Sequence, residues 1–149
     1  MHDMERLRIL VVDDSLTIRA ILNEVIGSEP GFVVVGLAAD ADEAGRMLET
    51  RVVDVVTLDI EMPGINGIEF LERFRTAHST PVIMLSARTA RGDEMRARAL
   101  CAGADACFHK ADAVRQKQEL IELIKSVAHH EAVLDSEDLA AKGSRRSEG

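Results

Sequence analysis

Five short runs rich in valine, isoleucine and leucine alternate along the chain with five segments of helical periodicity. Runs this apolar, without an alternating polar face, are typical of parallel strands that are buried on both sides. Parallel neighbours in one sheet need crossover connections, which are right-handed in nearly all proteins. The pattern therefore predicts an α/β fold, a (βα)5 doubly wound parallel five-stranded sheet. Strands are expected at 7–12, 32–36, 54–58, 81–85 and 105–109, and helices at 15–27, 41–50, 66–77, 90–102 and 113–130.

The periodic pattern ends near residue 130. The segment that follows, EAVLDSEDLAAKGSRRSEG, has few apolar residues and cannot bury enough surface to offset the cost of ordering. We therefore expect one domain over residues 1–130 and a disordered tail over residues 131–149, in which a short helix near 135–142 is an alternative.

The composition of the chain limits the kinds of molecule that the protein can be expected to bind. A net charge of −8 argues against nucleic acid, because neutralising phosphates needs a basic face. The chain has no run of about 18 apolar residues, and its first apolar stretch, ILVV, ends in two aspartates rather than in a cleavage site. We expect a cytoplasmic protein that binds neither nucleic acid nor membrane. Cys101 and Cys107 lack a metal-binding spacing and are interpreted as small buried residues in a reducing compartment.

Polar residues stand at the carboxyl ends of four predicted strands. Asp13 and Asp14 close the first, Asp59 the third, Ser86 the fourth and Lys110 the fifth. Ligands of doubly wound sheets bind at this edge. Three carboxylates there repel one another and favour a hard cation such as Mg²⁺, which takes carboxylate, water and phosphate oxygens. With a hydroxyl and an amine added, the set indicates phosphoryl chemistry.

Each feature alone has a plainer explanation. An Asp-Asp pair commonly ends a strand, Ser86 suits a helix cap, and Lys110 suits a solvated surface. The functional interpretation depends on their occurring together, with MPGING following the third strand.

Four segments, VVDDS, LDIEMPGINGIEFL, PVIMLSA and GADACFHK, resemble the receiver domain of two-component response regulators over about residues 6–130. The resemblance implies the flavodoxin-like strand order 2-1-3-4-5. DIEMPGINGIEF is also similar to the receiver part of the chemotaxis methylesterase.

By this resemblance Asp59 is the phospho-acceptor, whose carboxylate attacks a phosphohistidine. Lys110 and Ser86 would contact the phosphoryl oxygens. Glu61 and Arg88 are oppositely charged, and each follows a site residue by two positions. The hypothesis is that they meet over the phosphate and set its lifetime; the alternative is that both point into solvent. The implied Mg²⁺ ligands are Asp14, Asp59, the backbone carbonyl of Glu61 and, through water, Asp13.

Two positions depart from the family pattern. Proline usually follows the lysine, often in a cis bond, whereas this chain has Ala111, for which a cis bond costs about 2.5–4 kcal/mol and a trans bond is expected. The switch position, usually Tyr or Phe, is Cys107. Phe108 cannot replace that aromatic ring, because adjacent strand residues face opposite sides.

The resulting hypothesis is a stand-alone receiver that is not an enzyme beyond accepting and slowly losing its own phosphoryl group. Its expected donor is a sensor histidine kinase or histidine phosphotransferase. Its downstream protein target would bind the face formed by the fourth helix, fifth strand and fifth helix. No esterase or DNA-binding domain fits in the remaining tail. Two alternatives stay open: a receiver-like module that binds partners independently of phosphorylation, and a truncated N-terminal domain of a larger regulator.

Overall fold

The computed structural model describes residues 6–140, with side chains for residues 6–129. Five parallel strands form one sheet in the order β2-β1-β3-β4-β5. Because the order reverses between β1 and β3, the sheet is doubly wound, and the predicted fold and strand order are confirmed. The strands are β1 (Leu7–Val12), β2 (Phe32–Ala38), β3 (Val55–Asp59), β4 (Val82–Ser86) and β5 (Ala106–His109).

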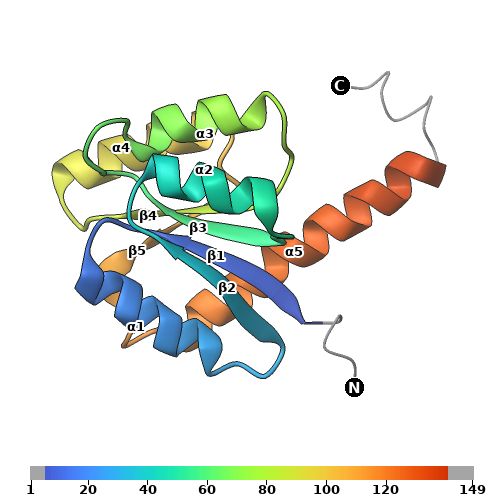
Figure 1. Ribbon diagram of the computed structural model, residues 1–149, viewed down its shortest axis with the longest axis horizontal. Helices are drawn as coiled ribbons and strands as arrows, with labels where there is room; N and C mark the ends of the chain where they lie inside the picture. The colour runs from blue at the N-terminus through green and yellow to red at the C-terminus, as the bar shows by residue number, and fades with distance from the viewer. Residues whose placement is uncertain (1–5, 141–149) are drawn as a thin grey trace.

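Helices cover both faces of the sheet, as Figure 1 shows, with α1 and α5 on one side and α2, α3 and α4 on the other. A 3-10 helix, η2 (Lys110–Asp112), follows β5. The α-helices are α1 (Leu16–Gly27), α2 (Ala41–Thr50), α3 (Gly67–Arg75), α4 (Ala90–Cys101) and α5 (Lys117–Ala140).

The core lies in two layers because strand side chains alternate between the faces. Leu10 and Leu58 pack toward α2, α3 and α4, whereas Ile9 and Leu85 pack toward α1 and α5. All residues of β3 and β4 are buried. Burial on both faces explains why these strands are apolar throughout rather than at every second position.

Capping residues fix where the helices begin beside the strand ends. Ser15 accepts the Ile18 amide at 3.2 Å and starts α1. Asn66 and Glu69 form a reciprocal capping box at the start of α3. Thr89 accepts the Gly92 amide at 2.8 Å and starts α4. Short capped turns of this kind hold the loops after β1, β3 and β4 close to the sheet.

The last helix differs most from the sequence-based expectation. It begins at Lys117 rather than at residue 113, because η2 and a further turn first carry Asp112 and Ala113 into the interior. Its backbone continues as a helix to Ala140, through part of the segment predicted to be disordered, while residues 141–149 lie outside the described residues. The domain boundary at residue 130 stays a prediction.

Two further observations concern the burial of the cysteines and the search for membrane-spanning helices. Cys101, the last residue of α4, is exposed and Cys107 is half-buried, so the expectation that both are buried is wrong. Among residues 6–140, no helix is long and apolar enough to cross a bilayer.

Candidate functional site

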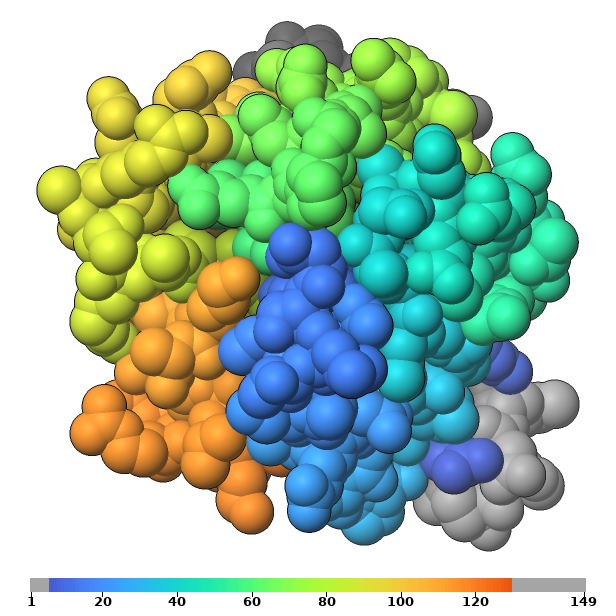
Figure 2. Space-filling model, turned by 60° about the vertical axis from the view of Figure 1, so that its left-hand side comes forward, coloured from blue at the N-terminus to red at the C-terminus, as the bar shows by residue number. Residues whose placement is uncertain are grey.

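Four loops meet at the carboxyl edge of the sheet. Parallel registry sets Val12 opposite Leu58, Asp59 opposite Leu85, and Ser86 opposite His109, so neighbouring strands end at nearly the same level. Figure 2 looks onto this edge and shows the segments that follow β1 (blue), β3 (green), β4 (yellow) and β5 (orange) gathered around it. The topology thus brings together the residues that the sequence places at strand ends.

Three carboxylates form the centre of this edge. Asp13 and Asp59 are 0% and 1% exposed, whereas Asp14 faces solvent. One oxygen from each lies within 4.8 Å of the other two. The Oδ1 atoms of the buried pair accept backbone amides, from Ser15 at 2.9 Å and from Glu61 at 3.2 Å. Their Oδ2 atoms are buried and have no hydrogen-bond partner among the described residues, which is the arrangement that a bound cation would satisfy.

Lys110 supplies positive charge from the opposite side. Its Nζ lies 3.1 Å from Oδ1 of Asp59 and 3.7 Å from Oδ2 of Asp13. One ammonium group faces three carboxylates, so the cluster keeps a net negative charge. The two positive charges of a divalent metal ion would neutralise it.

The ionisation of the cluster reflects this imbalance. Burial, followed by repulsion from Asp13, raises the pKa of Asp59 to about 7 despite the attraction of Lys110. Burial likewise raises the pKa of Asp13. Burial alone would lower the pKa of Lys110, but the Asp59 and Asp13 carboxylates outweigh it and raise that pKa. The ionised, metal-free cluster is thus destabilised mainly by its burial and in addition by repulsion between its carboxylates.

Ser86 places a hydroxyl beside the Asp59 carboxylate. Its side chain is buried, and its Oγ has no hydrogen-bond partner among the described residues. A hollow of about 10 Å³ lies between Asp59, Ser86, Ala87 and Lys110, with Gly92 on its wall. That volume barely admits one water molecule. A buried hydroxyl on a residue that lines so small a space is suited to donate to an oxygen of a group that enters it.

Two glycines allow the loops to pack this tightly. A Cβ at Gly67 would lie 2.2 Å from the carbonyl oxygen of Asp59, and one at Gly92 would lie 2.0 Å from that of Ala87. No side chain fits at such distances, so the first turns of α3 and α4 touch the loop backbone directly. Gly67 is the first residue of α3, directly after the capping residue Asn66.

The expectation that Glu61 pairs with Arg88 is wrong, because each residue pairs with a different partner. Glu61 accepts from Arg91 Nε at 3.1 Å, and Arg88 instead pairs with Asp112. The loop after β4 directs Arg88 toward η2, while the first turn of α4 brings Arg91 over the loop after β3. Sequence reasoning missed Asp112. The available signal was its offset, since it follows Lys110 by two residues, as Glu61 follows Asp59 and Arg88 follows Ser86.

Cys107 and Phe108 of β5 lie on opposite sides of the sheet, as strand alternation predicts. Cys107 packs against the α2–α4 side and its Sγ lies 3.8 Å from the carbonyl oxygen of Arg96, whereas Phe108 packs on the opposite side. The trans bond expected before Ala111 is confirmed, because residues 6–140 contain no cis peptide bond. Position 107, the expected switch position, carries no aromatic ring.

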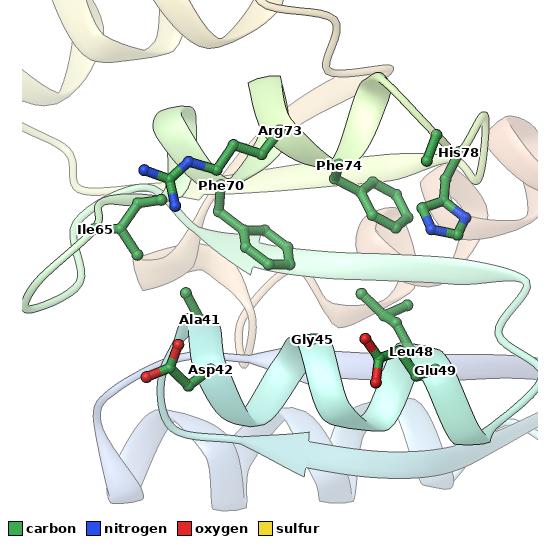
Figure 3. A pocket seen from close by; sticks show the side chains of 11 residues that line it. Ala41, Asp42, Gly45, Leu48, Glu49, Ile65, Phe70, Arg73, Phe74 and His78 are labelled. Atoms are coloured by element: carbon green, nitrogen blue, oxygen red, sulfur yellow. The ribbon is translucent and has the colours of Figure 1, made fainter.

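A separate groove of about 400 Å³ lies between α2 and α3, away from the carboxylates. Figure 3 shows Phe70 extending from α3 toward α2, and Phe74 lying beside His78. Phe74 also stacks on His78, with ring centroids 4.6 Å apart. The groove contains no residue of the carboxylate cluster, so it is not part of the candidate site.

Comparisons with known proteins agree with this geometry. Residues 9–125 match the family described as the response regulator receiver domain. The chain is 45% identical over 125 residues to a protein-glutamate methylesterase/protein-glutamine glutaminase of Caulobacter vibrioides, covering 83% of this chain and 36% of that protein. A counterpart in Burkholderia thailandensis is 41% identical over 128 residues, covering 82% and 36%. The chain thus spans about a third of the length of these curated relatives.

Solved structures show the same relationship. The response regulator domain of CheB from Thermotoga maritima superposes with a TM-score of 0.75 at 37% identity, covering 83% of this chain and 97% of that chain. A chain from the complex of the CheA3 P1 domain with CheY6 of R. sphaeroides has a TM-score of 0.70 at 31% identity, covering 83% and 97%. With strand order, strand-end residues and sequence all in agreement, the chain belongs to the family of response regulator receiver domains.

Proposed function

We propose that this protein accepts a phosphoryl group on Asp59 from a phosphohistidine and signals through altered protein–protein binding. The observation that carries the proposal is the environment of Asp59. Its carboxylate is almost fully buried, lies 3.1 Å from Lys110, and has one oxygen without a hydrogen-bond partner. A buried carboxylate next to an ammonium group and two further acids is equipped for transfer of an anionic group.

In the proposed step, an Asp59 oxygen forms a bond to phosphorus as the phosphorus–nitrogen bond of the donor breaks. The electron pair of the broken bond returns to the imidazole. Lys110 stays within reach of the charge that develops on the phosphoryl oxygens. Ser86 then donates its hydroxyl to one of these oxygens. The open hollow of about 480 Å³ beside Asp14 and Glu61 provides the approach for the donor histidine.

Mg²⁺ is the proposed metal of this site. The unpartnered buried oxygens of Asp13 and Asp59, and the exposed Asp14, fit an ion that takes carboxylate and water ligands. Asp14, Asp59 and the backbone carbonyl of Glu61 would hold it directly, and Asp13 through water. When bound, the ion would neutralise charge on the transferred group. Glu61 and Arg88 remain proposed modulators of the lifetime of the phosphorylated form, each now with a different partner.

A sensor histidine kinase or histidine phosphotransferase is the proposed donor. The complex of CheA3 P1 with CheY6 supports this choice by analogy. The proposed target surface is the face of α4, β5 and α5, and the proposed location is the cytoplasm. The methylesterase activity in the names of the relatives is not carried over, because the matched region is about a third of those proteins.

A second candidate is a receiver-shaped module that binds its partner without phosphorylation. Cys107 and Ala111 favour it, because they replace residues on which the usual switch depends. The arrangement of Asp59, Ser86 and Lys110 favours the first proposal. Apolar residues at these buried positions would stabilise the fold better, so the polar groups point to a functional role.

The test is incubation with acetyl phosphate, with Mg²⁺ or with EDTA, followed by intact mass. We expect the wild type to gain one phosphoryl group only with Mg²⁺. Asp59→Asn should gain none, while Asp42→Asn, which changes an exposed aspartate on α2, should behave as wild type. A phosphorylated Asp59→Asn variant would overturn the assignment, and an unmodified wild type would favour the second candidate.

A further inference from the structure

The groove between α2 and α3 gathers aromatic rings in a chain that has few of them. Phe70, Phe74 and His78 follow one another at intervals of four residues, so they form one stripe along α3 and the turn after it. The ring centroids of Phe70 and Phe74 lie 6.0 Å apart, and those of Phe74 and His78 lie 4.6 Å apart. Two of the four phenylalanines of the chain thus line this groove, and Phe70 is only half-buried. We call these three rings the aromatic row.

The opposite wall, on α2, leaves room above the aromatic row. Gly45 lines this wall, and a Cβ at its position would have nothing within 4 Å. Leu48 is half-buried and adds apolar surface. The groove holds about 400 Å³, which lies within the range of volumes that binding sites in proteins have. It therefore has space for side chains of a bound segment.

Charged side chains lie at both ends of the groove. Figure 3 shows Glu49 below His78 at one end, and Asp42 below Arg73 at the other. Asp42 and Glu49 are seven residues apart on α2, which corresponds to about 10 Å. Within residues 6–129, no ion pair or side-chain hydrogen bond involves Asp42, Glu49 or Arg73. A bound segment would thus find a carboxylate at one end and a guanidinium at the other, each open to a partner.

The end of the chain carries the complementary charges in the matching order. Residues 141–149 read AKGSRRSEG, in which two arginines precede Glu148. Alternate residues of an extended segment project from the same side, so Arg146 and Glu148 would share one side, about 7 Å apart, and Arg145 would face the other. Their long side chains cover the rest of the distance between the groove ends. An arginine suits this groove, because its planar guanidinium can stack on aromatic rings and pair with a carboxylate.

Helix α5 leads the chain toward the matching end of the groove. Figure 1 shows α5 leaving the domain on the side where α2 and α3 end. Glu49 and His78 lie at these helix ends. The helix ends at Ala140, so Arg146 follows six residues later and can lie up to about 20 Å from it. A segment that enters from this side brings its arginines to the groove before Glu148.

We propose that residues 144–148 of this chain bind as an extended segment in the groove between α2 and α3. Arg146 lies on the aromatic row and pairs with Glu49. Glu148 reaches toward Arg73. The inference is independent of the proposed phosphorylation, because the groove contains no residue of the carboxylate cluster. Bound in this way, the segment covers the aromatic row and closes this surface to other proteins.

The test is amide NMR spectroscopy of the full chain, in which a change in the tail is detected in the groove and a change in the groove is detected in the tail. The tail variants are Arg146→Ala and, as matched control, Arg145→Ala, which removes the same charge from the neighbouring residue. The groove variants are Glu49→Gln and, as control, Glu72→Gln, which changes an exposed acid of α3 outside this groove. The double variant Arg146→Ala/Glu148→Ala provides the reference for an unbound groove.

In Arg146→Ala, we expect the amide shifts of Gly45, Glu49 and His78 to move toward those of the reference. The ratio of bound to unbound segment should fall about two- to fivefold, as loss of one exposed ion pair implies. Glu49→Gln should move the amide shifts of residues 144–147 in the same sense. Arg145→Ala should leave the groove signals as in wild type, and Glu72→Gln should leave the tail signals as in wild type.

Groove signals that are identical in wild type and Arg146→Ala would overturn the proposal. Equal effects of Arg145→Ala and Arg146→Ala would overturn it as well, because an extended segment presents only one of the two arginines to the groove. Groove shifts that vary with protein concentration would show that a second copy supplies the occupant, and would overturn binding within one chain. None of these results depends on whether Asp59 accepts a phosphoryl group, so this inference and the proposed function are tested separately.

Discussion

Replacing the Asp59 carboxylate should make the metal-free protein more stable. Asp59→Asn keeps the size and one hydrogen-bond acceptor of the side chain but removes its charge. Burial and repulsion from Asp13 raise the pKa of Asp59 from 3.8 to about 7. Three pKa units correspond to about 4 kcal/mol, the largest stabilisation that removing the charge could give.

The pH dependence follows from the sign of the shift. Because the pKa of Asp59 is higher in the folded than in the unfolded protein, the folded state binds the proton more tightly, and wild-type stability falls as the pH rises from about 4 to about 7. The difference in unfolding free energy between Asp59→Asn and wild type should therefore be near zero below about pH 4 and largest above about pH 7.

The assay is urea unfolding in EDTA between about pH 4 and pH 8.5. Circular dichroism is the suitable probe, because the chain has no tryptophan and no tyrosine. Glu72→Gln, which changes an exposed carboxylate on α3, is the control and should stay within about 0.5 kcal/mol of wild type. Saturating Mg²⁺ should stabilise wild type more than Asp59→Asn. An Asp59→Asn variant no more stable than wild type in EDTA at about pH 8.5 would refute the reasoning.

Two further predictions concern the loops around the cluster. Gly67→Ala should destabilise the fold by about 1–3 kcal/mol, because its methyl group would meet the Asp59 carbonyl. Gly45→Ala, in open space on α2, should stabilise the fold by about 0.5–1 kcal/mol. Urea unfolding of both variants checks this prediction, and equal effects would contradict it. Glu61→Ala and Arg91→Ala should each speed loss of phosphate from the phosphorylated protein by less than about fivefold, because their ion pair is largely exposed. The double variant should lose phosphate no faster than either single variant, because both changes remove the same pair. Decay rates measured by intact mass check this, and additive effects would show that the two residues do not act as a pair.

The sheet and its edge were predictable because they depend on patterns that local sequence contains. Apolar runs without alternation identify β3 and β4, since both faces of these strands are buried. The chemical types at the strand ends identify Asp13, Asp59 and Lys110, because parallel strands must bring their carboxyl ends together.

What local sequence did not contain is the direction of long side chains in loops. Arg88 and Arg91 lie three residues apart, and either could have reached Glu61. The start of α4 decides between them, because it turns Arg91 toward β3 and leaves Arg88 facing η2. The start of α5 was equally hidden, since its apolar stripe begins only at Leu120 and the turn before it is held by backbone hydrogen bonds.

The central claim is that Asp59 carries the phosphoryl group. The most direct measurement is borohydride reduction of protein treated with a phosphorylated histidine phosphotransfer domain, because borohydride reduces an acyl phosphate to an alcohol and marks its position permanently. The tryptic peptide of residues 52–73 contains both Asp54 and Asp59, so its fragmentation spectrum distinguishes Asp59 from the aspartate that precedes β3. We predict reduction at Asp59 alone, whereas a mark on Asp54, Asp13 or Asp14 with Asp59 unmodified would contradict the account.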